Sequence, residues 1–272
     1  MIQIKRNALK ENLIALFWMT SSKKTKRFLE IDLLRGLAIS LMVFGHILWD
    51  LDYFNIIPMN GFIYSTLQKI VPTLFFLLVG ISIILSQKKK MLDKEKRKKG
   101  YELLFVRGFK IFNLGVILTI FSLIFLPARP VFFGVLHCIG FSIVLSIFFL
   151  KYKYSNLFLG LLFVIIGLYI SSIDFANPSL FHLIIGLHQT NIWQYTVDYF
   201  PLLPWFGVTL IGMGIGDIMY DCDKRRFKLP AIALSNYRPA KAFSWAGRHS
   251  LEIYLIHQPI LAGVIYVVMC CF

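Results

Sequence analysis

Residues 31–49 read IDLLRGLAISLMVFGHILW, a run about as long as the roughly 20 apolar residues with which a helix crosses a bilayer. Similar runs occupy 66–86, 103–126, 131–150, 155–172, 201–220 and 249–270. Of the 272 residues, 57% are hydrophobic and 16% are charged, and the mean hydropathy is +0.69. A water-soluble globule could not bury this much apolar surface. The sequence therefore predicts an all-α integral membrane protein, a bundle of about seven transmembrane helices.

The charged residues lie mainly between these runs and predict the orientation of the chain. Lys and Arg number seven in 1–30, eight in 87–102, two in 151–154 and seven in 221–248, whereas the alternate connections 50–65, 127–130 and 173–200 hold one in all. By the positive-inside rule, the N-terminus is cytoplasmic and the C-terminus is outside. This pattern accounts for the net charge of +15 without a nucleic-acid partner.

Two shorter apolar pieces complete the organisation of the chain. The piece at 13–19 lies within a basic tail and predicts an interfacial helix, and the piece at 179–187 is too short to cross a bilayer. We therefore expect a basic cytoplasmic tail at 1–30 and a single multi-pass transmembrane domain at 31–272. The expected location is the cell membrane.

The run 31–49 also carries ionisable residues, which are unfavourable inside a bilayer and therefore mark a candidate functional site. Arg35 and His46 are 11 residues apart, three helical turns plus about 20°, so they share one face and lie about 16 Å apart along the axis. Asp32 and Asp50 fall on the same stripe. Asp50 either fixes the tautomer of His46 as a general base or lies in the headgroup layer. The alternative to a site is an interfacial Asp32–Arg35 ion pair with a packing histidine at position 46.

Two further histidines lie inside apolar runs. His137 is either a second catalytic or substrate-contacting residue or a hydrogen-bonded packing histidine. His257 lies nearer the midplane, where a kink at Pro259 would free a carbonyl group that His257 could satisfy. Arg248 and Glu252, four residues apart, are typical of a structural ion pair. Because the histidines fall in different runs and the four cysteines lack ligand-like spacing, no metal site is expected.

The connections on the two sides of the membrane offer binding groups. Asp198 and Trp205, on the outer side, suit a sugar or amine acceptor and equally an ordinary aromatic belt. Arg107 and Lys110, on the inner side, would attract a phosphorylated cofactor or anionic lipids. The glycines of GMGIG at 212–216 indicate close helix packing.

Seven motifs extend along nearly the whole chain. They are EIDLLRGLA at 30–38, MVFGH at 42–46, DLDYF at 50–54, FFLLVGIS at 75–82, FGVLH at 133–137, DYFPLLPW at 198–205 and GRHSLEIYLIHQP at 247–259. As a set they resemble the heparan-α-glucosaminide N-acetyltransferase catalytic-domain family, in its short prokaryotic form, within the transmembrane acyltransferase superfamily. The resemblance implies acyl transfer across a membrane, from cytosolic acetyl-CoA to an acceptor on the other side.

The spacing of Arg35 and His46 also resembles the arginine–histidine pair of that superfamily, in which the histidine is catalytic. The chain departs from the eukaryotic members at Ile56, where those carry their reactive histidine. The catalytic histidine here must therefore be another, and the eukaryotic acceptor, a terminal glucosamine of heparan sulfate, is not carried over.

Together these observations predict an acyl-CoA-dependent acyltransferase that moves an acetyl group to an amine or hydroxyl group of a sugar or glycoconjugate. The expected residues are His46, Asp50 and His137 for catalysis; Asp32, Arg35, Arg107, Lys110, Arg248 and His257 for acetyl-CoA; and Asp52, Asp198 and Trp205 for the acceptor. Direct transfer and an acetyl-histidine intermediate both stay open, as does assembly into a homo-oligomer. The alternative function is a transporter or lipid-handling protein whose buried Asp and His residues relay protons.

Overall fold

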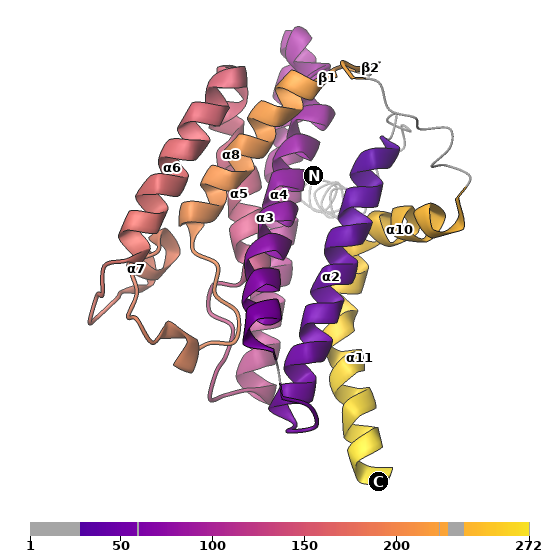
Figure 1. The fold of residues 1–272 in the computed structure, drawn as a ribbon. Helices are drawn as coiled ribbons and strands as arrows, with labels where there is room; N and C mark the ends of the chain where they lie inside the picture. The colour runs from indigo at the N-terminus through magenta and orange to yellow at the C-terminus, as the bar shows by residue number, and fades with distance from the viewer. Residues whose placement is uncertain (1–27, 59, 223, 228–236, 272) are drawn as a thin grey trace, which may run out of the picture.

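The computed structural model describes residues 28–58, 60–222, 224–227 and 237–271, and its elements are almost all helical (Figure 1). The interfacial helix expected at 13–19 lies outside the described residues. In chain order the elements are α2 (Leu29–Tyr53), α3 (Gly61–Gln87), η1 (Lys90–Leu92), α4 (Lys94–Phe125), α5 (Val135–Phe149), η2 (Leu150–Ser155), α6 (Asn156–Ser171), α7 (Leu180–Ile185), η3 (Ile192–Gln194), α8 (Leu202–Met219), β1 (Tyr220–Asp221), β2 (Lys224–Arg225), α10 (Arg238–Arg248) and α11 (Ser250–Cys271).

Six helical stretches of the described chain are long and apolar enough to cross a membrane. The fourth of them, Val135–Ser171, is divided at η2, where Lys153 has a φ of +46° and the chain reverses direction between α5 and α6 (Figure 1). The two predicted runs 131–150 and 155–172 are therefore separate helices within one stretch. The predicted all-α membrane bundle is confirmed.

α3 is the central helix, because it packs against α2 on one side and against α8 on the other. Its contact with α8 depends on glycines. A Cβ atom at Gly80 would come within 2.1 Å of the carbonyl oxygen of Thr209, and one at Gly212 within 2.3 Å of that of Leu77. The close packing predicted for 212–216 is confirmed, since small residues let the two backbones approach.

α10 is a helix in a segment that the sequence predicts only as a basic loop. It lies across the bundle rather than along it (Figure 1) and packs against the first half of α2. A Cβ atom at Gly36 would lie 1.9 Å from the carbonyl oxygen of Phe243, and one at Gly247 would lie 1.8 Å from that of Asp32. These two glycines fix α10 against α2, with backbone touching backbone.

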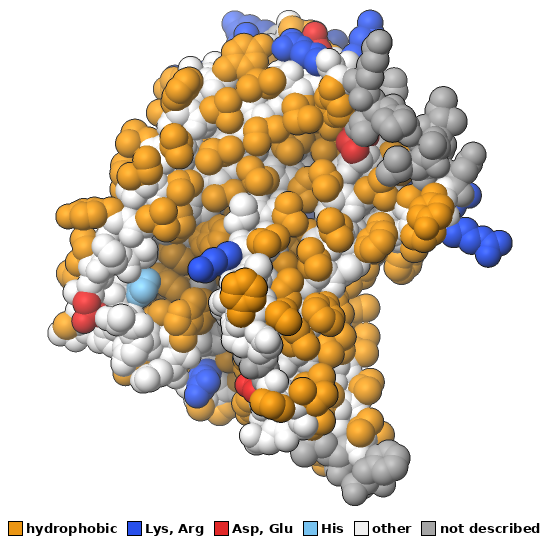
Figure 2. Space-filling view, in the orientation of Figure 1, with side chains coloured by type: hydrophobic (Ala, Val, Ile, Leu, Met, Phe, Trp, Pro, Cys, Tyr) orange, Lys and Arg blue, Asp and Glu red, His pale blue; other side chains and the backbone are white. Residues whose placement is uncertain are grey.

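Basic side chains gather at the end of the molecule that carries β1 and β2, the end that we expect to be cytoplasmic, while orange apolar side chains cover the flanks (Figure 2). Here Arg225 of β2 donates two hydrogen bonds of 2.7 Å to the carboxylate of Glu30, at the start of α2. Lys88, at the end of α3, forms an ion pair of 3.1 Å with Asp217 of α8. These ion pairs tie the ends of α2, α3 and α8 together.

The connection between α6 and α8, which we expect to lie outside, includes α7, a helix of six residues that is too short to span, as expected. Its start is closed by a capping box between Ser179 and His182. The segment that follows pairs with the chain before α5, because the backbone N–H of Phe200 donates to the carbonyl of Phe133. This connection therefore holds the residues around Asp198 against the start of α5.

Candidate active site

His46 of α2 meets His257 of α11, and their ring centroids lie 4.7 Å apart in an edge-to-face arrangement. His257 is only 9% exposed, and its Nδ1 lies 2.7 Å from the carbonyl oxygen of Tyr254. Since a carbonyl oxygen can only accept, Nδ1 carries a proton, and in the neutral ring Nε2 therefore keeps the lone pair. Within the described residues this buried Nε2 has no hydrogen-bond partner. In its neutral form the pair thus presents an imidazole lone pair inside the bundle.

Asp50 lies one turn beyond His46 and is 1% exposed. Its Oδ1 accepts a 2.9 Å hydrogen bond from Nε2 of Gln258, the residue after His257, and no hydrogen bond to His46 is found in the described chain. The expected orientation of His46 by Asp50 is therefore absent, because α11 packs against α2 here and supplies the partners of both residues. Oδ2 of Asp50 and Oε1 of Gln258 are buried without partners among the described residues.

The inner end of the polar stripe holds Asp32 and Arg35, which form the predicted ion pair at 3.7 Å. Arg35 also donates a hydrogen bond to the hydroxyl of Ser82 on α3. Arg107 of α4 is exposed and is close enough to Arg35 for the two positive charges to repel each other. Lys110 follows Arg107 by three residues and is half-buried on the same helix. Two guanidinium groups that come near each other from different helices favour an anion close to both.

His137 occupies a different place from the one expected of a catalytic residue. It is 4% exposed and lies between α4 and α5, where its ring contacts those of Phe112 at 5.2 Å and Phe133 at 5.6 Å. The ring also lies against Gly115, where a Cβ atom would come within 2.9 Å of Nδ1. The structure gives it aromatic neighbours and no ring contact with His46 or His257 among the described residues. These contacts are those of a packing residue, but its buried Nδ1 has no hydrogen-bond partner among the described residues, so the hydrogen-bonded packing role and the catalytic role both stay predictions.

Asp198 lies at the start of α5 rather than in an open rim. Its Oδ2 accepts a 3.1 Å hydrogen bond from the backbone N–H of Val135, the first residue of α5, and a Cβ atom at Gly134 would lie 2.2 Å from that oxygen. A carboxylate is stabilising at this position because a helix N-terminus carries partial positive charge. Burial nevertheless raises the pKa of Asp198 to about 6. Tyr254, from α11, is near enough to interact with its charge.

The remaining predicted residues lie apart from the histidine pair. Trp205 packs in the largest core cluster, with its ring 5.3 Å from those of Phe76 and Phe200. Asp52 is exposed near the outer end of α2. Arg248 is exposed at the end of α10, and its expected ion pair with Glu252 is replaced by a 3.9 Å contact between Glu252 and His249.

The sequence missed three residues that the structure brings to the site: Ser82, Tyr254 and Gln258. Tyr254 and Gln258 flank His257 at helical spacing, so a polar face of α11 was visible in the sequence as Tyr254-x-x-His257-Gln258. Ser82 gave no such signal. Across the described ranges no group of three or more His, Cys, Asp or Glu residues could hold a metal ion.

A model of the family described as "Heparan-alpha-glucosaminide N-acetyltransferase, catalytic" matches residues 27–259. This range includes both histidines of the pair, both inner arginines and Asp198. Neither the curated proteins nor the solved structures contain a significant match to the chain.

Proposed function

We propose that this chain, which belongs to the heparan-alpha-glucosaminide N-acetyltransferase catalytic family, is a membrane acetyltransferase. It transfers an acetyl group from cytosolic acetyl-CoA to an acceptor on the outer side of the cell membrane. The acceptor group is an amine or hydroxyl group of a sugar or glycoconjugate. The observation that carries the proposal is the contact of His46 with His257, whose buried Nε2 has no hydrogen-bond partner among the described residues. A neutral imidazole is the base that such a transfer requires, and we assign that role to His46, with the ring of His257 against it.

Arg35 and Arg107 would hold the phosphates of acetyl-CoA. A guanidinium group binds phosphate through two parallel hydrogen bonds, and an anion between the two arginines removes their mutual repulsion. Ser82 and Asp32 position Arg35 by a hydrogen bond and an ion pair. From Arg35 the thioester arm would extend about 16 Å along α2 to reach His46.

At His46 the acceptor loses a proton to the imidazole while its nitrogen or oxygen attacks the thioester carbonyl. The new bond to the acetyl carbon forms, the carbon–sulfur bond breaks, and the departing CoA thiolate takes the proton from the imidazolium. The neutral ring of His257 stabilises that imidazolium through its free lone pair. The hydroxyl of Tyr254, whose ring centroid is 5.7 Å from that of His257, would donate to the developing oxyanion.

Buried side-chain oxygen atoms on α2 and α11 recognise the acceptor. Oδ2 of Asp50 and Oε1 of Gln258 can only accept hydrogen bonds, and both lack partners within the described residues. They therefore suit a group rich in donors, such as an amine or several sugar hydroxyl groups. Asp52, exposed near the outer end of α2, would guide such an acceptor inward.

Calorimetric titration of the purified full chain with acetyl-CoA tests the proposal without knowledge of the acceptor. We expect saturable binding that Arg35→Gln and Arg107→Gln each weaken by about 10- to 150-fold, the range for a lost charge-assisted hydrogen bond. His46→Ala should keep binding, and Lys151→Gln, an exposed basic residue on another loop, is the matched control. Absence of binding by folded protein would overturn the proposal and favour a proton-relaying transporter.

Two further readouts separate the routes that acyl transfer can take. Incubation with acetyl-labelled CoA and no acceptor would leave label on the protein if an acetyl-histidine forms, and none if transfer is direct. Direct transfer predicts that His46→Ala loses turnover while keeping affinity for acetyl-CoA. Retained turnover in His46→Ala would place the base elsewhere.

A further inference from the structure

α10 has the surface of a helix that lies in a membrane interface. Its sequence, RPAKAFSWAGR, contains no acidic residue, and Ala240, Ser244 and Gly247 form its buried face. Trp245, on the side away from this face, is 55% exposed, and Tyr237, just before the helix, is 65% exposed. Aromatic and basic residues together on one amphipathic helix are typical of the boundary between headgroups and acyl chains.

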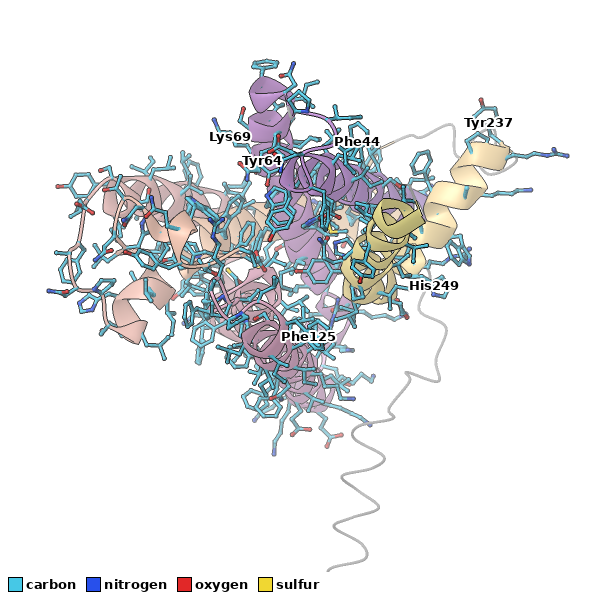
Figure 3. The ribbon with its side chains drawn as sticks, turned by 90° about the horizontal axis from the view of Figure 1, so that it is seen from below. Phe44, Tyr64, Lys69, Phe125, Tyr237 and His249 are labelled. Carbon is cyan, nitrogen blue, oxygen red and sulfur yellow. The ribbon has the colours of Figure 1, made fainter. Side chains whose placement is uncertain are left out.

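Arg238 and Lys241 lie one turn apart on the exposed side of α10. Within the described part of the chain neither has a carboxylate partner. Figure 2 shows basic side chains projecting over α10 beside exposed apolar ones, and Figure 3 places Tyr237 at the tip of the helix, away from the bundle. Two cations without a protein counter-charge at this level of the membrane attract an anion.

An apolar groove of about 280 Å³ begins beside α10 and follows α2. It is lined chiefly by Ile39, Val43, Phe44, Ile47, Ala246 and Ile253. From Ile39 to Ile47 it extends about 12 Å along α2, away from the end expected to be cytoplasmic and across the middle of that helix. In the view from below, Phe44 lies along the same edge of the molecule as Tyr237 (Figure 3).

We propose that this face is a binding site for one anionic phospholipid of the inner leaflet. Its phosphate contacts Arg238 and Lys241, and one acyl chain lies in the groove between α2, α10 and α11. The groove begins beside α10 and leads away from the end expected to be cytoplasmic, as an acyl chain does from an inner-leaflet headgroup at α10. The positive charge of α10 selects an anionic headgroup from the leaflet that carries anionic lipids. The site is separate from the histidine pair, and the inference does not depend on the proposed function.

Native mass spectrometry of the full chain in detergent, titrated with dioleoyl phosphatidylglycerol or dioleoyl phosphatidylcholine, tests the site. The two lipids share their chains, so a difference between them reports the headgroup. Each cation near the membrane surface raises the affinity for an anionic lipid about fivefold. With two such cations, the native chain should therefore prefer the anionic lipid by about 30-fold. The double variant Arg238→Gln/Lys241→Gln should lose this preference, while Lys151→Gln, a basic residue at the far side of the bundle, should keep it.

The groove is tested separately at Ser40, which also lines it and is exposed. Ser40→Trp should lower the retention of both lipids at least tenfold, whereas Ser40→Ala should leave it unchanged. Equal retention of the two lipids by the native chain, or an unchanged preference in the double variant, would overturn the headgroup site. Equal retention by Ser40→Trp and Ser40→Ala would overturn the placement of the chain. Circular dichroism establishes that each variant is folded.

Discussion

The packing of α10 on α2 can be tested by one substitution made at two glycines of the same helix. At Gly36 a new Cβ atom would lie 1.9 Å from the carbonyl oxygen of Phe243, whereas at Gly45 its nearest neighbour, a side-chain atom of Leu67, is 3.7 Å away. Ordinary contact requires about 3.5 Å. Gly36→Ala must therefore move α10 away from α2 by about 1.5 Å, while Gly45→Ala moves nothing.

The magnitude follows from two opposing effects. Alanine in place of a helical glycine stabilises by up to about 1 kcal/mol, and this gain is common to both variants. Overpacking costs about 1–3 kcal/mol and applies only to Gly36→Ala, because the clash is with backbone that cannot rotate aside. The difference in free energy of unfolding between the two variants thus isolates the clash at about 1–3 kcal/mol.

Thermal unfolding in one detergent, followed by tryptophan fluorescence, measures this difference. With about 2–4 °C per kcal/mol for chains of this size, Gly36→Ala should unfold about 2–12 °C below Gly45→Ala. Because Arg35 precedes Gly36, its hydrogen bond to Ser82 should also loosen and weaken acetyl-CoA binding. An unfolding temperature for Gly36→Ala at or above that of Gly45→Ala would refute the close contact of α10 with α2.

Three other variants test ion pairs and buried carboxylates. Burial raises the pKa of Asp198 to about 6 from an ordinary value near 3.9. The neutral carboxyl group therefore stabilises the fold fully below about pH 4, and this stabilisation, at most about 3 kcal/mol, is lost as the pH rises through 6. Asp198→Asn should flatten that part of the curve of unfolding temperature against pH, and an unchanged curve would contradict this. Gln258→Leu leaves the carboxylate of Asp50 without its hydrogen bond and should lower the free energy of unfolding by about 1.5–3 kcal/mol. Adding Asp50→Leu should recover most of this loss. A double-mutant cycle that shows no coupling would contradict the interaction of Asp50 with Gln258. Glu30→Gln should cost about 1 kcal/mol, because the ion pair with Arg225 is partly exposed, and the loss should shrink at high salt.

The sequence by itself determined the class of fold and the family. Apolar runs of about 20 residues predict spanning helices because no other open structure satisfies its backbone in lipid. It also predicted close packing at the glycines of 212–216, which leave room for a neighbouring backbone, while the structure identified that neighbour as α3. The ion pair of Asp32 with Arg35 followed from their spacing on one helix.

Only the tertiary structure decided which polar groups meet. His46 and His257 lie far apart in the sequence, and their contact depends on how α11 is rotated against α2. Hydrophobic periodicity cannot give that rotation, because lipid-facing and protein-facing positions of a membrane helix are both apolar. In the same way Asp198 and Trp205, the first and last residues of the motif DYFPLLPW, became the cap of α5 and a core residue. A buried polar side chain takes the partner that packing brings within reach, and that partner is fixed by the whole bundle.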